Sequence, residues 1–306
     1  MKLFSLKLPE STKRKVRSRF LLPLALCLSP VTFHLLPSSP PPAVAQTTDA
    51  RKAEADRLLD QGLQQHQIGQ FPAALDSWQQ ALQIYRALKN RHKEGWALGN
   101  LGGAYSSLGN YAKAIEYSQQ RLVIAREIKD RNGEGQALSN LGKTYRSLGN
   151  YAKAIEYMQQ WLAIAREIQD RRGEGTALGN LGLAYRSLGD YDKAIEYGQQ
   201  SLDIAQEIKN RHGEGATLGN LGIAYYSQGN YAKAIEYGQQ QLATAREIQD
   251  RQGEGLALGN LGIAYDSLGN YAKAIEYGQQ HLAIAREIKD RQGEGMALNN
   301  LGVALL

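Results

Sequence analysis

Cysteine and proline are scarce in this sequence, and neither is spread evenly. Among 306 residues there is one cysteine, Cys27, and eight prolines, of which only Pro72 lies beyond residue 45. A single cysteine excludes an internal disulfide framework and a four-cysteine zinc site. Of 36 basic and 30 acidic residues, seven and one fall in residues 1–45, which leaves 29 of each in the rest. This charge balance argues against a nucleic-acid partner, because such binding requires clustered positive charge.

Residues 1–45 have the order of an export signal. A basic stretch over the first 19 residues precedes a mostly apolar stretch over residues 20–36, and an Ala-Val-Ala sequence ends at Ala45. We predict a signal peptide over 1–45, cleaved near Ala45, and a periplasmic or extracellular mature chain. The alternative is a membrane anchor over residues 20–36, which is short of the ~20 residues that span a bilayer. A lipid attachment signal at Cys27 is a weaker alternative, because Leu26 stands where such a signal has a small residue.

The rest of the chain is one 40-residue unit repeated. Residues 211–250 and 251–290 are identical at 32 of 40 positions. A fixed period of this length indicates a repeat architecture. The expected units are a divergent first copy at 46–94, five copies at 95–134, 135–174, 175–214, 215–254 and 255–294, and an incomplete seventh at 295–306.

Each unit has the apolar spacing of two amphipathic helices. Leu98, Leu101, Tyr105 and Leu108 mark the first helix, and a second stripe with a spacing near 3.6 begins at Tyr111. The sequence Gly109-Asn110 between them predicts a glycine helix end followed by an N-cap. We expect Gly133 or Gly135 to break the chain before the next unit, Glu134 to favour the start of the next helix, and Glu127 with Arg131 to form an i,i+4 pair.

These residues resemble the tetratricopeptide repeat. Its signature is matched by Leu101-Gly102-x-x-Tyr105, Gly109-x-Tyr111 and Ala114. Leu98 replaces the usual tryptophan and no proline closes the unit, so the chain looks like the 40-residue variety of Pins-like adaptors, kinesin light chains and bacterial arrays. The resemblance implies an all-α, right-handed superhelix of antiparallel helix pairs. It also implies a non-enzymatic protein that needs no cofactor or metal and binds a peptide or protein segment in a concave groove.

Comparison of the copies within the chain locates that groove. The positions that differ between copies are spaced by seven and three, which puts them on one face of the first helix, opposite the leucine and tyrosine stripe. The candidate groove residues at these positions are Trp96, Gln136, Lys143, Arg146, Thr176, Leu183, Arg186, Ile223, Tyr226, Ile263 and Asp266.

One asparagine on the same face does not vary between copies. The members of this column that we assign to the groove are Asn100, Asn140, Asn180, Asn220 and Asn260. An amide donates and accepts, so a regular column could hold an extended ligand backbone, as the resemblance implies. The alternative is that each asparagine bonds to a neighbouring helix, or that recent duplication has kept it.

No catalytic constellation stands out elsewhere. The His92-x-Glu94 sequence recurs only as His212-x-Glu214, and we interpret both as solvated turns rather than metal sites. Two further hypotheses stay open. The chain could be the repeat portion of a longer enzyme, such as a caspase-like protease, and we expect it to be a fragment. Alternatively, the apolar end at Leu301, Leu305 and Leu306 could mediate self-association.

Overall fold

The computed structural model describes residues 48–305, so the expected signal peptide, its cleavage near Ala45 and the anchor over residues 20–36 lie outside the described residues. Within the described range there are thirteen helices and no strands, and none of these helices is long and apolar enough to cross a membrane. The helices are α1 Thr48–Gln67, α2 Phe71–Ala87, α3 Arg91–Ser107, α4 Tyr111–Glu127, α5 Arg131–Ser147, α6 Tyr151–Glu167, α7 Arg171–Leu188, α8 Tyr191–Glu207, α9 Arg211–Ser227, α10 Tyr231–Glu247, α11 Arg251–Ser267, α12 Tyr271–Glu287 and α13 Arg291–Ala304.

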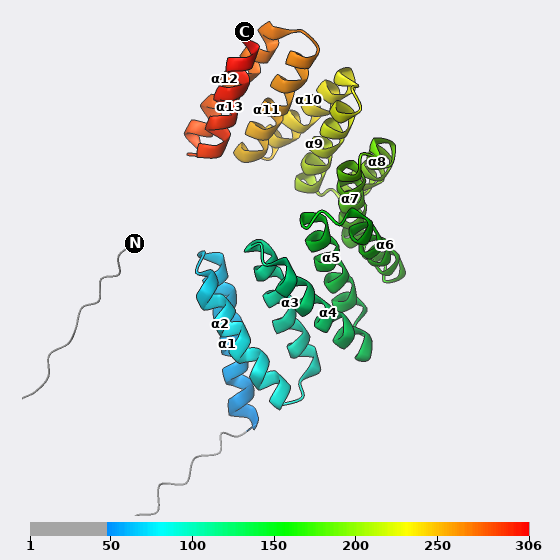
Figure 1. The fold of residues 1–306 in the computed structure, drawn as a ribbon, viewed down its shortest axis with the longest axis vertical. Helices are drawn as coiled ribbons and strands as arrows, with labels where there is room; N and C mark the ends of the chain where they lie inside the picture. Colours follow the sequence, from blue (N-terminus) through cyan, green and yellow to red (C-terminus); the bar gives the residue numbers. More distant parts are fainter. Residues whose placement is uncertain (1–47, 306) are drawn as a thin grey trace, which may run out of the picture. The chain divides into compact units, whose positions relative to one another are not determined.

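Helices that follow each other in the chain pack side by side as antiparallel pairs, and the pairs stack in chain order (Figure 1). From α3 onward each odd-numbered helix also contacts the next odd-numbered helix. The first helices of successive repeats therefore form a continuous row. The expected all-α solenoid of helix pairs is confirmed.

The turn inside each pair is built as predicted. Gly109 has φ 73°, a left-handed conformation that costs glycine little. Asn110 caps α4, because its Oδ1 accepts a hydrogen bond from the backbone N–H of Lys113 at 3.3 Å. Asp190 does the same for α8. The short turn leaves the second helix no room except alongside the first.

The break between repeats differs from the prediction. Gly133 and Gly135 lie inside the first turns of α5, which begins at Arg131. The chain turns at Lys129, which has φ 55° although it is not glycine, and Asp130 then caps α5 by accepting from the N–H of Gly133 at 2.8 Å. The same left-handed residue recurs in every copy, as Lys89, Gln169, Lys209, Gln249 and Lys289.

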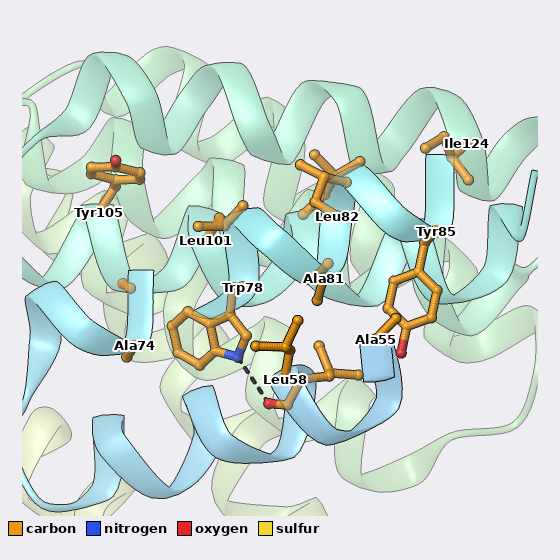
Figure 2. Packing of buried hydrophobic residues seen from close by; sticks show 14 of the residues in the cluster. Ala55, Leu58, Ala74, Trp78, Ala81, Leu82, Tyr85, Leu101, Tyr105 and Ile124 are labelled. Atoms are coloured by element: carbon orange, nitrogen blue, oxygen red, sulfur yellow. Dashed lines mark hydrogen bonds between the residues drawn. The ribbon is translucent and has the colours of Figure 1, made fainter. Parts of the chain in front are cut away.

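The core lies between the two helices of each pair and the first helix of the next. Leu98 and Leu101 are fully buried and Tyr105 nearly so, but Leu108 is 47% exposed, so the apolar stripe ends at the tyrosine. Figure 2 shows the N-terminal part of this core, where Trp78 fills the space between α1 and α2 and its Nε1 donates to the carbonyl of Leu59 at 3.2 Å. A tryptophan in the core needs such an acceptor for its N–H.

Buried glutamates join one repeat to the next. Glu174, in the first turn of α7, accepts from Arg166 at the end of α6 and from Arg171 in its own helix. Burial alone would raise the pKa of this carboxyl, but the two guanidinium groups outweigh it and hold the pKa below its usual value. Arg171 also pairs with Glu207, which closes the helix pair α7–α8.

This network corrects the expected i,i+4 pair. Glu127, at the end of α4, pairs with Arg91 at the start of α3, and Arg131 pairs with Glu134 and Glu167. The pairs Arg91–Glu127 and Arg131–Glu167 connect helices, Arg131–Glu134 lies within α5, and none of these pairs joins Glu127 to Arg131.

Candidate ligand groove

The residues predicted for the groove lie on the first helices α3, α5, α7, α9 and α11, and all are half-buried or exposed. We call the strip that they form the groove face. Because successive first helices are in contact, the strip runs from one repeat to the next without interruption by a second helix.

The asparagine column is half-buried along this strip. Asn180 donates from Nδ2 to the carbonyl of Thr176 at 2.8 Å, one turn back in its own helix. Across residues 48–305, no side chain of the column bonds to a neighbouring helix. Among these residues, the hydrogen bonds therefore give no support to the alternative that each asparagine bonds to a neighbouring helix.

The groove face is basic where α5 meets α7. Arg146 and Arg186 lie close enough that their charges repel, and burial, followed by the charge of Arg146, lowers the pKa of Arg186. The Nε of Arg146 is buried without a hydrogen-bond partner among the described groups. Lys143 adds a third cation one turn before Arg146. No carboxylate pairs with these three cations within the described residues.

The other groove residues make few polar contacts. Trp96 is 48% exposed, with the ammonium of Lys93 at 5.4 Å from its ring centre. Tyr226 is hydrogen-bonded through its hydroxyl to Ser267 at 3.0 Å. Ile223 and Ile263 present apolar surface between them. The chemistry of the groove face thus changes along the array, from basic at α5–α7 to mostly apolar at α9–α11, where Asp266 carries the one charge among the groove residues.

A second variable column, which the sequence analysis did not assign to the groove, lies beneath this face on the second helices. Its members are Arg121, Trp161, Ser201, Gln241 and His281, and all except the half-buried Trp161 are at most 9% exposed. Arg121 reaches from α4 to the groove residue Gln136 and donates to its Oε1. We call this set the floor column. It also differs in each of these five copies, so variation between copies is a sequence signal for the second helices as well.

The size of the floor residue helps to decide where a cleft opens. At Ser201, the smallest of the five, a cleft of about 200 Å³ lies between α7, α8 and α9 and is lined by Asn180, Thr217 and Asn220. Ser201 itself is satisfied, because its hydroxyl donates to the carbonyl of Gly175 at 2.8 Å. A second cleft, of about 220 Å³, lies between α9, α10 and α11.

The His-x-Glu sequences do not present open ligands. Glu94 is buried and accepts from Arg86 and Arg91, and Glu214 accepts from Gln206 and Arg211. In the described part of the chain, no three histidine, cysteine, aspartate or glutamate residues gather as a metal site would need.

Comparisons with solved structures show the same fold. The chain matches a signal-transduction ATPase with a tetratricopeptide repeat sensor from Pyrococcus horikoshii with TM-score 0.72 and 22% identity, covering 84% of this chain and 39% of that one. It matches a Rap protein complexed with competence and sporulation factor with TM-score 0.60 and 18% identity, covering 82% and 74%. A kinesin light chain from Podosopora anserina with nearly identical repeats gives TM-score 0.55 and 20% identity, covering 63% and 96%.

The chain spans less than half of the archaeal ATPase. No protein with a curated description matches it in sequence. The family model of the tetratricopeptide repeat, however, matches residues 54–127, 96–167, 133–207, 173–247 and 213–287, which together cover most of the chain. The chain therefore belongs to the tetratricopeptide repeat family.

Proposed function

We propose that this protein is a non-enzymatic scaffold that binds an extended peptide or protein segment along the groove face. The observation that carries the proposal is the asparagine column, whose amides lie along one continuous strip and make no bond to neighbouring helices. An amide pairs with a ligand N–H and C=O together, so one such group per repeat grips a backbone whatever its side chains. The variable residues beside the column then contact the ligand's side chains and select among them.

The family supports an interaction role. Tetratricopeptide repeats are typical of protein-interaction modules and are generally non-catalytic, and the Rap protein of similar fold holds a competence and sporulation factor. The even charge balance of residues 46–306 disfavours a nucleic-acid ligand. The cations Lys143, Arg146 and Arg186 favour acidic residues in the part of the ligand that lies over α5–α7.

Replacing two adjacent asparagines tests the proposal. Peptides are first selected on the protein from a displayed random library, and their affinities are measured by fluorescence anisotropy. Asn180→Ala combined with Asn220→Ala removes two sets of backbone hydrogen bonds and weakens binding roughly thirtyfold, at about 1 kcal/mol for each asparagine. Unchanged affinity with intact helicity would overturn the proposal.

A matched control comes from the second helices. Gln119→Ala combined with Gln159→Ala changes two exposed amides that lie away from the groove face and make no recorded hydrogen bond. This pair should leave peptide affinity unchanged, which separates loss of the asparagine column from a general effect of removing amides.

A second candidate function is sensing on behalf of a catalytic domain. It is favoured by the archaeal ATPase, in which similar repeats form the sensor of a much longer chain. In this case the groove ligand would control an attached enzyme, such as a caspase-like protease. Reading the coding sequence beyond codon 306 discriminates the two, since an immediate stop codon counts against an attached domain.

Export and self-association belong to the same proposal. N-terminal sequencing of the protein recovered outside the cytoplasm should begin near Gln46 if the leader is cleaved. Leu298 and Val303 on α13, and Leu305 just after it, are each about half exposed or more, and exposed apolar surface mediates association. Sedimentation at rising protein concentration should reveal any such association.

A further inference from the structure

The second cleft has the properties of a site for one side chain. It lies between α9 and α11, with α10 as its floor, and its volume is about 220 Å³. Pockets for whole small molecules usually measure about 300–1,000 Å³, so this one has room for a single large side chain. Its mouth is formed by the groove residues Ile223, Tyr226, Asn260 and Ile263, so a segment in the groove passes directly over it.

A glycine in the floor helps to leave room for the cleft. Gly238 occupies the position that Trp78, Ser118 and Met158 occupy in earlier repeats. In its own repeat Met158 is 1% exposed and fills the space beside Gly142. At Gly238 there is no side chain to fill the equivalent space, and the cleft remains.

The walls restrict what can enter. Apart from Gln241, Asn260 and the Tyr226 hydroxyl, the lining is glycine, alanine and isoleucine, and it contains no charged residue. Burying a charge without a partner is costly, so an ionised side chain is excluded. An apolar ring or aliphatic group is favoured.

One buried polar atom adds a further requirement. Gln241 is 6% exposed and lines the cleft, and its Oε1 has no hydrogen-bond partner among the described groups. Its amide lies beside α9, in the space that a Cβ on Gly219 would take, since that Cβ would come within 2.6 Å of Nε2. A buried acceptor without a partner costs free energy, which a hydrogen-bond donor from a ligand would recover.

We propose that this cleft is a specificity pocket for a tyrosine side chain of the segment bound in the groove, an inference that rests on the proposed function. A phenol ring matches the apolar walls, and its hydroxyl donates to Gln241 Oε1. The hydroxyl also accepts, so it satisfies the amide in either orientation, whereas an indole N–H only donates. The other four floor residues then give the other repeats different preferences for ligand side chains.

The test uses the isolated side chain as its probe. The protein is titrated with 4-methylphenol and, separately, with toluene, while the Gln241 side-chain amide is followed by NMR. We expect saturable binding of 4-methylphenol and about fivefold weaker binding of toluene. Gln241→Leu should abolish that preference, and Gly238→Met should abolish binding of both probes.

The neighbouring repeat supplies the control. Gly198→Met makes the same change at the equivalent position of α8, where the space is only about 10 Å³, and should leave 4-methylphenol binding at Gln241 unchanged. Equal affinity for the two probes, or full 4-methylphenol binding by a folded Gly238→Met variant, would overturn the pocket.

Selected peptides separate this inference from the proposed function. If the selected peptides bind the groove but share no preferred tyrosine, the pocket proposal is overturned and the scaffold proposal is unaffected. If the protein selects no peptide but still binds 4-methylphenol at Gln241, the scaffold proposal is overturned and the cleft remains only as a binding site for a phenol.

Discussion

Gln206 donates from Nε2 to Oε1 of Glu214 at 3.1 Å, at the one junction where the buried glutamate meets an amide instead of a guanidinium from the preceding helix. Elsewhere this position is an arginine, as at Arg166 and Arg246. The α8–α9 junction is also the one that holds the Ser201 cleft. Both features make it less tightly joined than the α6–α7 and α10–α11 junctions on either side.

Restoring the arginine should therefore stabilise the array. Gln206→Arg turns a neutral donor into a charged one toward Glu214, and we expect a gain of about 0.5–1 kcal/mol, limited by the solvent exposure of the arginine. Urea unfolding measures it. The gain should shrink in 1 M salt, and Arg246→Gln should cost a similar amount at the next junction. No shift in either variant would mean that these ion pairs contribute nothing to the junctions.

The turn between repeats offers a second prediction. Lys129 adopts φ 55° and is exposed, so Lys129→Gly relieves left-handed strain without removing a recorded contact. We expect a net gain of about 0.5–1 kcal/mol, since the strain of roughly 1–2 kcal/mol is partly offset by the entropy of an added glycine.

The control places a lysine at the left-handed glycine of the turn inside a helix pair. Gly109→Lys places a side chain at φ 73° and should cost about 1 kcal/mol. Thermal unfolding of the two variants side by side decides the matter. Destabilisation by Lys129→Gly would show that the lysine contributes through a contact rather than bearing strain.

The fold was predictable because the repetition multiplies each local signal. Leu98, Leu101 and Tyr105 fix the buried face of one helix, and Gly109 with Asn110 fixes the turn, in every copy. The turn between repeats was missed because the left-handed residue there is a lysine or glutamine, which carries no turn preference. The long-range partners of Glu127 were also out of reach, because Arg91 lies 36 positions away and meets it only through helix pairing.

The groove was predictable only in part. Variation between copies identified exposed positions on the first helices, because their spacing follows the helix period. The floor column also varies, but its residues lie on the second helices, and only packing shows that Arg121 touches Gln136. Gln241 likewise gains its meaning from the absence of a side chain at Gly238, three residues earlier.

Glycines within the first helices give a matched pair of predictions. At Gly182 an added Cβ would lie 3.1 Å from the carbonyl oxygen of Ala194, a backbone atom that cannot move aside cheaply. At Gly103 nothing lies within 4 Å. We expect Gly182→Ala to destabilise the protein by about 1–3 kcal/mol through overpacking, although alanine favours the helix. Gly103→Ala should instead gain up to about 1 kcal/mol. Denaturant midpoints of the two variants should move in opposite directions, and a common direction would refute the role of close helix approach.

The buried imidazole of His281 predicts how stability depends on pH. It is 6% exposed, packs against Gly259, and its Nδ1 has no partner among the described groups. Burial lowers the pKa of His281 below 6.5, and the charge of Asp290 opposes this only in part. The unfolded chain therefore binds a proton before the folded chain does. The contribution of the neutral, buried His281 to the free energy of unfolding is fully present above about pH 6.5. It declines as the pH falls below that value and levels off below the pKa of the folded state.

Urea midpoints at pH 7.5, 6.5 and 5.5 should show that decline in the unaltered protein, in a range where carboxylates stay ionised. In His281→Gln, which installs the residue that the preceding repeat carries as Gln241, the decline should be smaller because the buried titrating group is gone. The same slope in both proteins would assign the pH dependence to other histidines, and His281 would then be a packing residue alone.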